Sequence, residues 1–278
     1  MYIKGDFHLH TTSSDGRLSP SELVNLAKNE GLDIIAITDH DNTFGVEEGI
    51  REGKSIGVKV IPGIELSTRY NDENIHILGY FRDDSFKSDH FQNYLKEIQD
   101  YRIVRAEKII NNLKKFFNIE LNFQKLLDAN HGVIARPHIA KAIIDAGYPY
   151  DFKYIFHKFL SSNSPAYVPN KRISIAEGIE VLRSVKAVIS LAHPTLIKKS
   201  PVEEIIKQDF DCIEAIYPLN KEGEEEFFRH LAKKYKKIVT AGSDYHGVGE
   251  EDHKHGYIGT STLIGEELNI FLEKLEPL

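Results

Sequence analysis

Short apolar runs alternate with segments of helical spacing over the first and last parts of the chain. The runs are nearly continuous, which is typical of strands buried on both faces of a parallel sheet. Between them, apolar residues recur every three or four positions, as in amphipathic helices. This alternation predicts an α/β fold. The predicted strands lie at Asp33–Thr38, Val58–Ile61, Ala187–Leu191, Cys212–Ile216 and Ile238–Gly242.

Capping residues mark the ends of several predicted helices. Ser19 suits the N-cap, Pro20 the first helical position, and Glu22 completes a capping box. Gly31 ends this helix. The predicted helix at Glu222–Lys237 begins with acidic residues and ends with basic residues. This order complements the helix dipole and indicates a stabilising surface rather than a binding patch. The later helices are predicted near Ser174–Ser184, Pro201–Lys207 and Glu222–Lys237.

Two strand-like segments surround a polar turn after the second predicted strand. That strand, Val58–Ile61, is closed by Pro62-Gly63. The segments Ile64–Thr68 and Ile75–Tyr80 then flank Asn71–Asn74. This arrangement predicts a β-hairpin.

The character of the chain changes near residue 84. Apolar residues recur at helical spacing from Phe86 to Phe117, and no strand signal of note appears before Ala166. We predict a helical insertion, or cap, over residues 85–165, and a main domain built from residues 1–84 and 166–278. Shorter helices are predicted at Phe123–Ala129, Pro137–Ala146 and Phe152–Leu160.

Composition places the chain among ordinary globular proteins. It has 278 residues, of which 41% are hydrophobic and 28% charged. No run approaches the ~18 apolar residues needed to span a membrane, and the first residues lack the apolar core of a signal peptide. The single cysteine, Cys212, lies in an apolar run, which favours a core thiol over a nucleophile. We therefore expect a cytoplasmic protein without a membrane partner.

The net charge of −7 argues against broad attraction to nucleic acid. Divalent ions bound at one site would nevertheless make that site locally cationic. The charge therefore does not exclude a phosphorylated substrate.

Two histidines near the N-terminus share one face of a predicted strand. His8 and His10 are two residues apart, so their side chains point the same way, and Asp15 follows on a Ser/Gly-rich turn. Taken alone, this stretch could hold a metal ion or simply two surface histidines. The rest of the chain decides between these interpretations.

Histidines and carboxylates follow most of the other predicted strands. In parallel α/β barrels the loops at the carboxyl ends of strands converge on one face, so these side chains should meet. Imidazole and carboxylate without thiolate suit Mn, Fe, Zn or Co, and nine ligands fit two or three ions better than one. The candidate metal ligands are His8, His10, Asp15, His40, Glu65, His76, His193, Asp244 and His246.

These motifs resemble the PHP (polymerase and histidinol phosphatase) superfamily. That resemblance implies a distorted (β/α)7 TIM-like barrel with metal-dependent phosphoesterase activity. Within the superfamily the chain is most similar to the branch that acts on 3′,5′-nucleoside bisphosphates and short 5′-phosphorylated RNA, whose helical insertion carries an Arg-Pro-His segment, here Arg136–His138. The matching segments are Asp6–His10, Ser14–Gly16, Thr38–Asp41, Pro62–Ser67, His76–Tyr80, Ala192–Pro194 and Gly242–His246.

The resemblance also implies how the ligands divide among the ions. One ion would be held by His8, His10, Glu65 and Asp244; a second would share Glu65 and add His76 and His193; a third would use Asp15, His40 and His246. A carboxylate can bridge because it offers two oxygens. Some relatives have histidine at the position of Asp15, and the harder ligand favours Mn, with Fe or Zn as alternatives.

The implied reaction is hydrolysis of a phosphate monoester by metal-bound hydroxide. Arg136 could bind phosphate through its planar guanidinium, or merely cap a surface helix. His138 could bind phosphate or protonate the leaving oxygen, and it is assigned a catalytic role together with Asp244. Lys171 and Arg172 are weaker candidates for phosphate binding.

Other polar residues near these motifs receive supporting roles. Asp39 and Asp41 flank His40 and are expected to orient ligands. Tyr245 could line the pocket or pack at a strand end. The remaining histidines are expected on the surface or in packing contacts: His90, His131, His157, His230, His253 and His255.

Two other functions stay open from the sequence. One is a histidinol-phosphate phosphatase, which the Arg-Pro-His segment disfavours. The other is a metal-binding accessory module of a replication complex, which the intact ligand set disfavours. A small phosphorylated molecule is the expected partner, and no obligate protein partner is evident.

Overall fold

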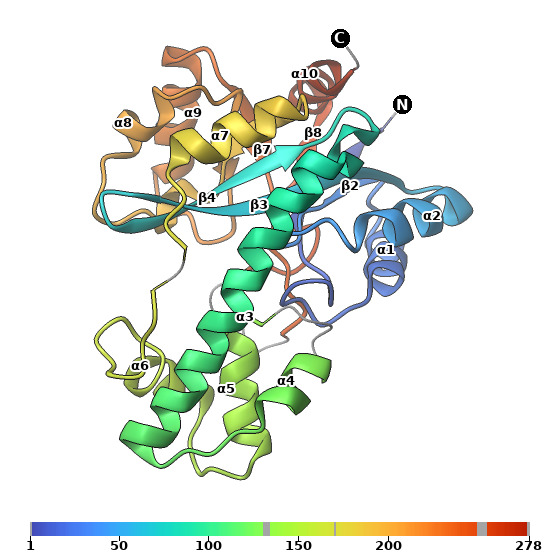
Figure 1. Ribbon diagram of the computed structural model, residues 1–278. Coiled ribbons are helices and arrows are strands. Elements are labelled where there is room, and N and C mark those ends of the chain that lie inside the picture. Colours follow the sequence, from blue (N-terminus) through green and yellow to red (C-terminus); the bar gives the residue numbers. More distant parts are fainter. Residues whose placement is uncertain (1, 130–133, 170, 249–254, 277–278) are drawn as a thin grey trace. The chain divides into compact units, whose positions relative to one another are not determined.

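The computed structural model describes residues 2–129, 134–169, 171–248 and 255–276. Contacts divide the chain into two compact units (Figure 1). The first comprises Met1–Gln92 and Arg172–Leu278, and the second is Asn93–Lys171. We call them the sheet unit and the helical unit and describe each by itself.

The sheet unit is built on eight strands in the order β7-β6-β5-β4-β3-β2-β1-β8. Beyond the strands, Leu9 at the end of β1 pairs in parallel with Tyr245, and the His10 N–H donates to the Tyr245 carbonyl at 3.0 Å. The sheet therefore nearly closes into a barrel, and the predicted α/β barrel is confirmed. The strands are β1 (Lys4–Leu9), β2 (Ile34–Ile37), β3 (Lys59–Tyr70), β4 (Glu73–Tyr80), β5 (Val188–Leu191), β6 (Cys212–Ile216), β7 (Ile238–Ala241) and β8 (Leu263–Ile264).

The sheet mixes parallel and antiparallel pairs. β1 with β2, β2 with β3, β5 with β6 and β6 with β7 are parallel, as their apolar runs predict. β4 runs antiparallel to both β3 and β5, and β3–β4 is the predicted hairpin. β8 runs antiparallel to β1 and was not predicted, because two residues are too few to form a strand pattern.

The prediction that Pro62-Gly63 ends a strand is wrong, because β3 continues through both residues. The part of β3 before Gly63 pairs in parallel with β2, and the part from Gly63 onwards pairs antiparallel with β4. Pro62 thus lies where the strand changes partner, so its missing N–H interrupts little of either ladder. Its carbonyl still accepts a hydrogen bond from the Phe81 N–H at 2.8 Å.

Helices follow most strands of the sheet unit. The capping box of the first helix is confirmed, since Ser19 Oγ accepts from the Glu22 N–H and the Glu22 carboxylate accepts from the Ser19 N–H. The helices are α1 (Pro20–Asn29), α2 (Val46–Ile56), α7 (Ile175–Ser184), α8 (Val202–Ile206), α9 (Glu224–Lys234) and α10 (Gly265–Leu275), with 3-10 turns at Asp84–Lys87 and Pro194–Leu196.

The C-terminal helix α10 is a structural element that sequence reasoning missed. Its Phe271 is fully buried and meets Phe7 of β1 and Tyr80 of β4 edge to face, with ring centroids 4.7 and 5.1 Å away. Such aromatic contacts are stabilising beyond the area they bury. α10 therefore belongs to the core of the sheet unit.

The helical unit has a hydrophobic core of its own. Ile109 and Leu113 of α3 pack in this core with Ile139 and Ile143 of α5 and Ile155 of α6. No strand occurs among the described residues of this unit. Its helices are α3 (Asp89–Phe117), which begins just before the unit boundary, α4 (Phe123–Ala129), α5 (Arg136–Asp145) and α6 (Phe152–Lys158).

Among the residues that the structure describes, no helix is long and apolar enough to cross a membrane.

Candidate metal centre

The sheet unit brings the nine predicted ligands together at one end of its sheet, where most follow the carboxyl ends of strands, while Glu65 lies inside β3 and His76 lies in the first half of the antiparallel β4. Backbone pairing positions these residues. Glu65 forms a β-bridge with His40. Ala192, the residue before His193, donates its N–H to the His76 carbonyl at 3.2 Å. Gly242 lets β7 approach β1, because a Cβ at this position would lie 2.2 Å from the Cβ of His8. Sequence-distant ligands thereby face a common site.

Glu65 lies at the centre of this site. Its Oε1 lies 2.8 Å from His76 Nδ1 and 2.9 Å from His193 Nε2. Its other oxygen, Oε2, lies 3.3 Å from His8 Nε2, 3.2 Å from His10 Nε2 and 3.0 Å from His40 Nδ1. The two oxygens of one buried carboxylate thus face two different sets of imidazoles.

Asp244 and Asp15 complete the cluster. Asp244 Oδ1 lies 3.1 Å from His10 Nε2 and 3.4 Å from His8 Nε2. Asp15 Oδ1 lies 3.2 Å from His246 Nε2, and Asp15 Oδ2 lies 3.9 Å from His40 Nε2. Two four-residue sets could each hold an ion: His8 with His10, Glu65 and Asp244, and His10 with Asp15, His40 and His246.

The cluster fits a metal ion on its own geometry. Several of its nitrogen and oxygen atoms are buried, lie close to one another and make no hydrogen bond, an arrangement that is costly unless a cation compensates it. The donor set of imidazole and carboxylate suits Mn, Fe, Zn or Co. The atoms are His8 Nε2, His10 Nε2, Asp15 Oδ1, His40 Nδ1, Glu65 Oε2 and Asp244 Oδ1.

The carboxylates of the cluster are held ionised. Burial alone would raise the pKa of Glu65, but His40, His76 and His8 outweigh it and hold that pKa well below its usual range. Burial would likewise raise the pKa of Asp244, but His8 and the other nearby imidazoles outweigh it and hold that pKa well below its usual range. The site therefore presents negative charge to any bound cation.

The imidazoles respond to the same carboxylates. Burial lowers the pKa of His10, but the adjacent carboxylates of Asp244 and Glu65 more than offset it and raise the pKa to about 10. Burial dominates at His40, where it lowers the pKa to about 3. In the protein without metal, protons on imidazole thus supply part of the positive charge that the carboxylates attract.

The backbone is strained at three residues that follow strands and lie in this region. Asp41, His193 and Asp244 have positive φ angles of 53°, 26° and 55°. Such conformations disfavour residues other than glycine and cluster at functional sites. Strained backbone of this kind positions functional side chains at some cost in stability.

Glu214 is a site residue that the sequence prediction missed. It lies in β6, is fully buried, and its Oε1 lies 3.0 Å from His8 Nδ1. Its Oε2 accepts a hydrogen bond from the backbone N–H of His193 at 2.7 Å. The signal that could have found it is an acidic residue in the middle of an apolar strand, since buried carboxylates are rare unless paired.

Tyr217 was also missed, whereas Asp39 and Asp41, which we expect to orient ligands, contact the segments that carry them. The Tyr217 hydroxyl donates to Asp244 Oδ2 at 2.9 Å. Asp39 accepts hydrogen bonds from Thr11 and Ser14 and so holds the turn that carries Asp15. Asp41 Oδ1 accepts from the backbone N–H of Ser67 at 2.7 Å, which ties the loop after β2 to β3.

His255 lies beside the cluster, contrary to the expectation of a surface or packing role. Its ring stacks on that of His246 with centroids 4.0 Å apart, and its Nε2 lies 4.0 Å from Asp244 Oδ2. His90, His157 and His230 are exposed, as expected. His131 and His253 lie outside the described residues. Tyr245 packs against the core and meets Tyr257 edge to face.

The predicted substrate residues lie in the helical unit. Arg136 begins α5, and its guanidinium donates to the Leu160 carbonyl at 3.3 Å. His138 Nδ1 accepts from the Ala135 N–H at 3.1 Å, so in the neutral ring the proton is on Nε2. Lys171 lies 3.4 Å from the Glu97 carboxylate.

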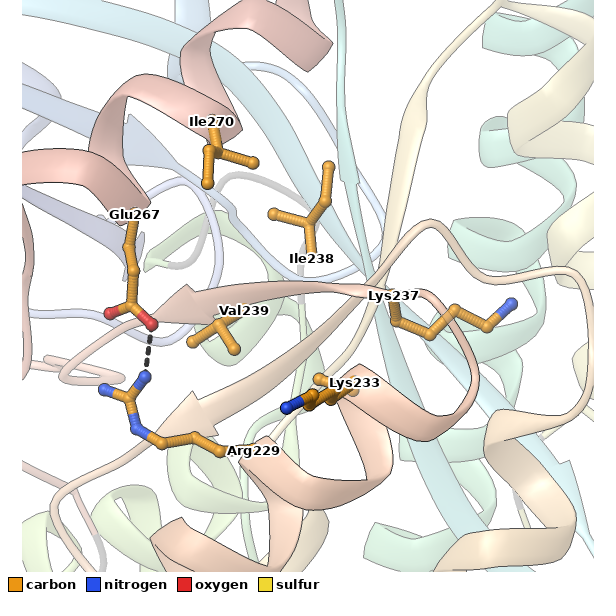
Figure 2. A pocket seen from close by; sticks show the side chains of 8 residues that line it. Arg229, Lys233, Lys237, Ile238, Val239, Glu267 and Ile270 are labelled. Carbon is orange, nitrogen blue, oxygen red and sulfur yellow. Dashed lines mark hydrogen bonds and ion pairs between the residues drawn. The ribbon is translucent and has the colours of Figure 1, made fainter.

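A cavity of about 300 Å³ opens in another part of the sheet unit (Figure 2). Ile238 and Val239 at the start of β7 line it, together with residues of α9 and α10. The ion pair between Arg229 and Glu267 lies at its edge (Figure 2). The predicted metal ligands Asp244 and His246 follow the opposite end of β7, and the cavity is lined by none of the predicted site residues.

Comparison with known proteins agrees with the geometry of the site. Residues 6–243 match the model of the PHP domain. The chain is 29% identical to the 5′-3′ exoribonuclease Rnm of Salmonella typhimurium, over 87% of this chain and 84% of that protein. It is 26% identical to a 3′,5′-nucleoside bisphosphate phosphatase of Chromobacterium violaceum, over 91% of this chain and 90% of that protein.

A solved structure shows the same architecture over nearly the whole chain. It is a candidate metal-dependent phosphoesterase from Bifidobacterium adolescentis, with a TM-score of 0.85 and 26% identity, covering 97% of this chain and 96% of the other.

Proposed function

The chain belongs to the PHP domain family and is a metal-dependent phosphoesterase, and from this we propose that its substrate is a phosphorylated nucleotide. The proposed substrates are a 3′,5′-nucleoside bisphosphate, from which hydrolysis would release one phosphate group, or a short 5′-phosphorylated RNA, from which hydrolysis of a phosphate ester would release phosphate or a nucleotide. Support comes from the two relatives above, one named a 5′-3′ exoribonuclease and the other a 3′,5′-nucleoside bisphosphate phosphatase.

The observation that carries the proposal is the position of Glu65. One buried carboxylate faces His76 and His193 with one oxygen and three other imidazoles with the second. This arrangement suits a ligand shared by two ions. A single structural ion would not need both sets.

We propose that the nine residues hold two or three divalent ions, with Mn favoured and Fe or Zn as alternatives. When bound, such ions lower the pKa of coordinated water and neutralise charge on a phosphate group. Glu214 holds the His8 ring, and Tyr217 holds the Asp244 carboxylate, so that their free atoms stay aimed at the cluster. Asp244 would thereby take part in catalysis, because its negative charge stays beside the bound ions and the reacting group.

Residues 85–165 are proposed to act as the insertion domain that supplies substrate contacts. Arg136 would bind a phosphate group through its fork of N–H donors. His138 would donate its Nε2 proton to a phosphate or to the leaving oxygen, which its bonded Nδ1 favours. Lys171, just after this segment, would add positive charge. Its ammonium group would then contact both the Glu97 carboxylate and the phosphate group.

We further propose a cytoplasmic location and a small-molecule partner. The buried, unpaired Cys212 supports the location, because a reducing compartment keeps thiols free.

The test is an assay of purified full-length protein with Mn²⁺ and with a chelator. Phosphate release would be measured from adenosine 3′,5′-bisphosphate and histidinol phosphate, and release of phosphate or mononucleotide from a 5′-phosphorylated oligoribonucleotide. We expect release from one or both nucleotide substrates, dependent on Mn²⁺. Release from histidinol phosphate alone would contradict the proposal, and so would the absence of release from all three.

A further inference from the structure

The main chain that follows His255 holds this residue beside the metal cluster. The Gly256 N–H donates to the Ser243 carbonyl at 2.7 Å, one residue before the predicted ligand Asp244. A side chain at Gly256 would force the main chain apart, because its Cβ would lie 2.3 Å from Pro218 Cγ and 2.9 Å from the Ser243 carbonyl oxygen. Close packing against the segment after β7 therefore fixes where His255 lies.

Two further contacts anchor the same segment to β1. The Gly259 N–H donates to Asp6 Oδ2 at 2.9 Å, while Asp6 Oδ1 accepts from the Ser243 N–H at 3.0 Å. Ile258 is only 2% exposed and belongs to the core of the sheet unit. One carboxylate thus links the segment after His255 and the segment after β7 to the strand that carries His8.

The His255 ring faces two predicted ligands. Its Nε2 lies 4.0 Å from Asp244 Oδ2, and its ring stacks on that of His246 with centroids 4.0 Å apart. One ligand atom of each of these three residues lies within 4.8 Å of the other two. A metal–ligand distance is about 2.1 Å, so two ligand atoms of one ion lie up to about 4.2 Å apart. Small side-chain movements therefore suffice for all three residues to share an ion.

His246 belongs to two groups of candidate ligands. It forms one group with Asp244 and His255, and it also lies in the group that contains Asp15 and His40. Its Nδ1 donates to the Asp244 main-chain carbonyl at 2.7 Å, so the lone pair of the neutral ring is on Nε2. Because a single imidazole nitrogen binds one ion, both groups describe ligands of the same ion.

We propose that His255 is an additional metal ligand, which binds the same ion as His246. Stacking on His246 requires only a ring, whereas the approach of Nε2 to the carboxylate of Asp244 requires a nitrogen. The inference rests on the proposed function, because it concerns the ions of the Glu65-centred cluster, and it extends that function by a ligand outside the nine predicted ones. Neutral imidazole is a common ligand of divalent metals, and one more donor makes the ion at His246 harder to remove.

The test is Mn²⁺ binding by full-length protein that has first been stripped of metal with a chelator. Free Mn²⁺ is measured by electron paramagnetic resonance during the titration. His255→Phe keeps a ring that can stack on His246 but has no nitrogen. We expect it to weaken binding of one Mn²⁺ per chain at least about tenfold and to leave the remaining sites within about twofold.

The matched control is His230→Phe, at an exposed histidine of α9, which should change no Mn²⁺ affinity more than twofold. Circular dichroism confirms that each variant folds. Mn²⁺ binding by His255→Phe equal to that of the control would overturn the proposal. Loss of binding in His255→Ala with full binding in His255→Phe would also overturn it, because ring packing alone would then explain the effect.

A second variant decides the question if His255→Phe does not fold. His255→Ala is then titrated with Mn²⁺ in the presence and absence of free imidazole. Weakened binding that imidazole restores would support a missing nitrogen ligand. Binding equal to that of the control, or weakened binding that imidazole does not restore, would contradict it.

Hydrolysis assays distinguish this proposal from the proposed function. If the unchanged protein hydrolyses no nucleotide while one Mn²⁺ site depends on His255, the proposed function fails and the ligand assignment stands. If the unchanged protein hydrolyses a nucleotide and Mn²⁺ binding does not respond to His255→Phe, the ligand assignment fails and the function stands.

Discussion

A single carboxylate, Glu214, determines which nitrogen of His8 is available at the cluster. An ionised carboxylate can only accept hydrogen bonds, so the proton of a neutral His8 ring lies on Nδ1, and Nε2 keeps its lone pair toward Glu65 and Asp244. Carboxylates that hold a metal-bound histidine in this way tune both its orientation and its basicity.

Replacing Glu214 with glutamine should disturb this arrangement with little change in shape. The amide oxygen can still accept from the His193 N–H, but the amide NH₂ then faces His8 Nδ1 and drives the ring proton to Nε2. We expect Glu214→Gln to weaken metal binding about 10- to 100-fold. Mass spectrometry of metal content after dialysis against buffered Mn²⁺ measures this.

The matched control is Glu226→Gln, an exposed residue of α9. Metal content in Glu214→Gln equal to that of the control would remove Glu214 from the site.

Residue identities predicted the candidate ligands, because strand ends that converge bring separate histidines and carboxylates to one face. They did not predict Glu214 or His255. Glu214 was hidden in the strand run of Cys212–Ile216, and nothing local shows that its side chain faces His8. His255 follows a polar loop, and its place beside His246 depends on how that loop folds back.

At the scale of elements, Asp211 joins three parts of the sheet unit. Its Oδ2 accepts from the backbone N–H of Ile189 in β5 at 2.9 Å and from Arg183 of α7, and its Oδ1 lies 3.0 Å from Lys274 Nζ of α10. Burial raises the pKa of this carboxyl, but Arg183 and the Ile189 N–H outweigh it, and the pKa is lowered overall.

Asp211→Asn should therefore cost about 2 kcal/mol of unfolding free energy at pH 7. Because the folded-state pKa is depressed, the stabilisation is present above the unfolded pKa of about 3.9 and is lost as pH falls below it. The difference between variant and unchanged protein should shrink toward pH 3. Urea unfolding at pH 7 and pH 3.5 measures both effects.

Asp209→Asn is the control, because Asp209 binds the same Arg183 but is 74% exposed. Exposed pairs contribute little, so we expect a change within about 0.5 kcal/mol. A difference for Asp211→Asn that grows as the pH falls would contradict the assigned direction of the pKa.

Element positions followed well from the sequence where local signals are strong. The cap at Ser19 and the runs of β6 and β7 are local features. Pro62 misled the prediction because tertiary pairing on alternate edges of β3 removes the usual cost of proline in a strand. β8 forms by pairing with β1, and α10 packs against the rings of Phe7 and Tyr80; no local sequence pattern predicts either contact.

For the whole molecule, metal binding depends on the folded sheet unit. His8 and His10 come from β1, Glu65 from β3, and Asp244 from the loop after β7, so no single segment carries a complete site. The net charge of −7 offers phosphorylated substrates no general attraction. Their recognition therefore depends on positive charge that is localised at the site.

We infer that the Glu65-centred cluster holds the metal ions that carry out hydrolysis. The most direct measurement is Mn²⁺-dependent phosphate release from adenosine 3′,5′-bisphosphate by Glu65→Gln, together with metal content per chain and the Glu226→Gln control. We expect kcat/KM to fall about 10³-fold or more with loss of more than one ion per chain, because Glu65 faces both ligand sets. Activity of folded Glu65→Gln equal to that of the control, or equal release by the unchanged protein after chelation, would contradict the account.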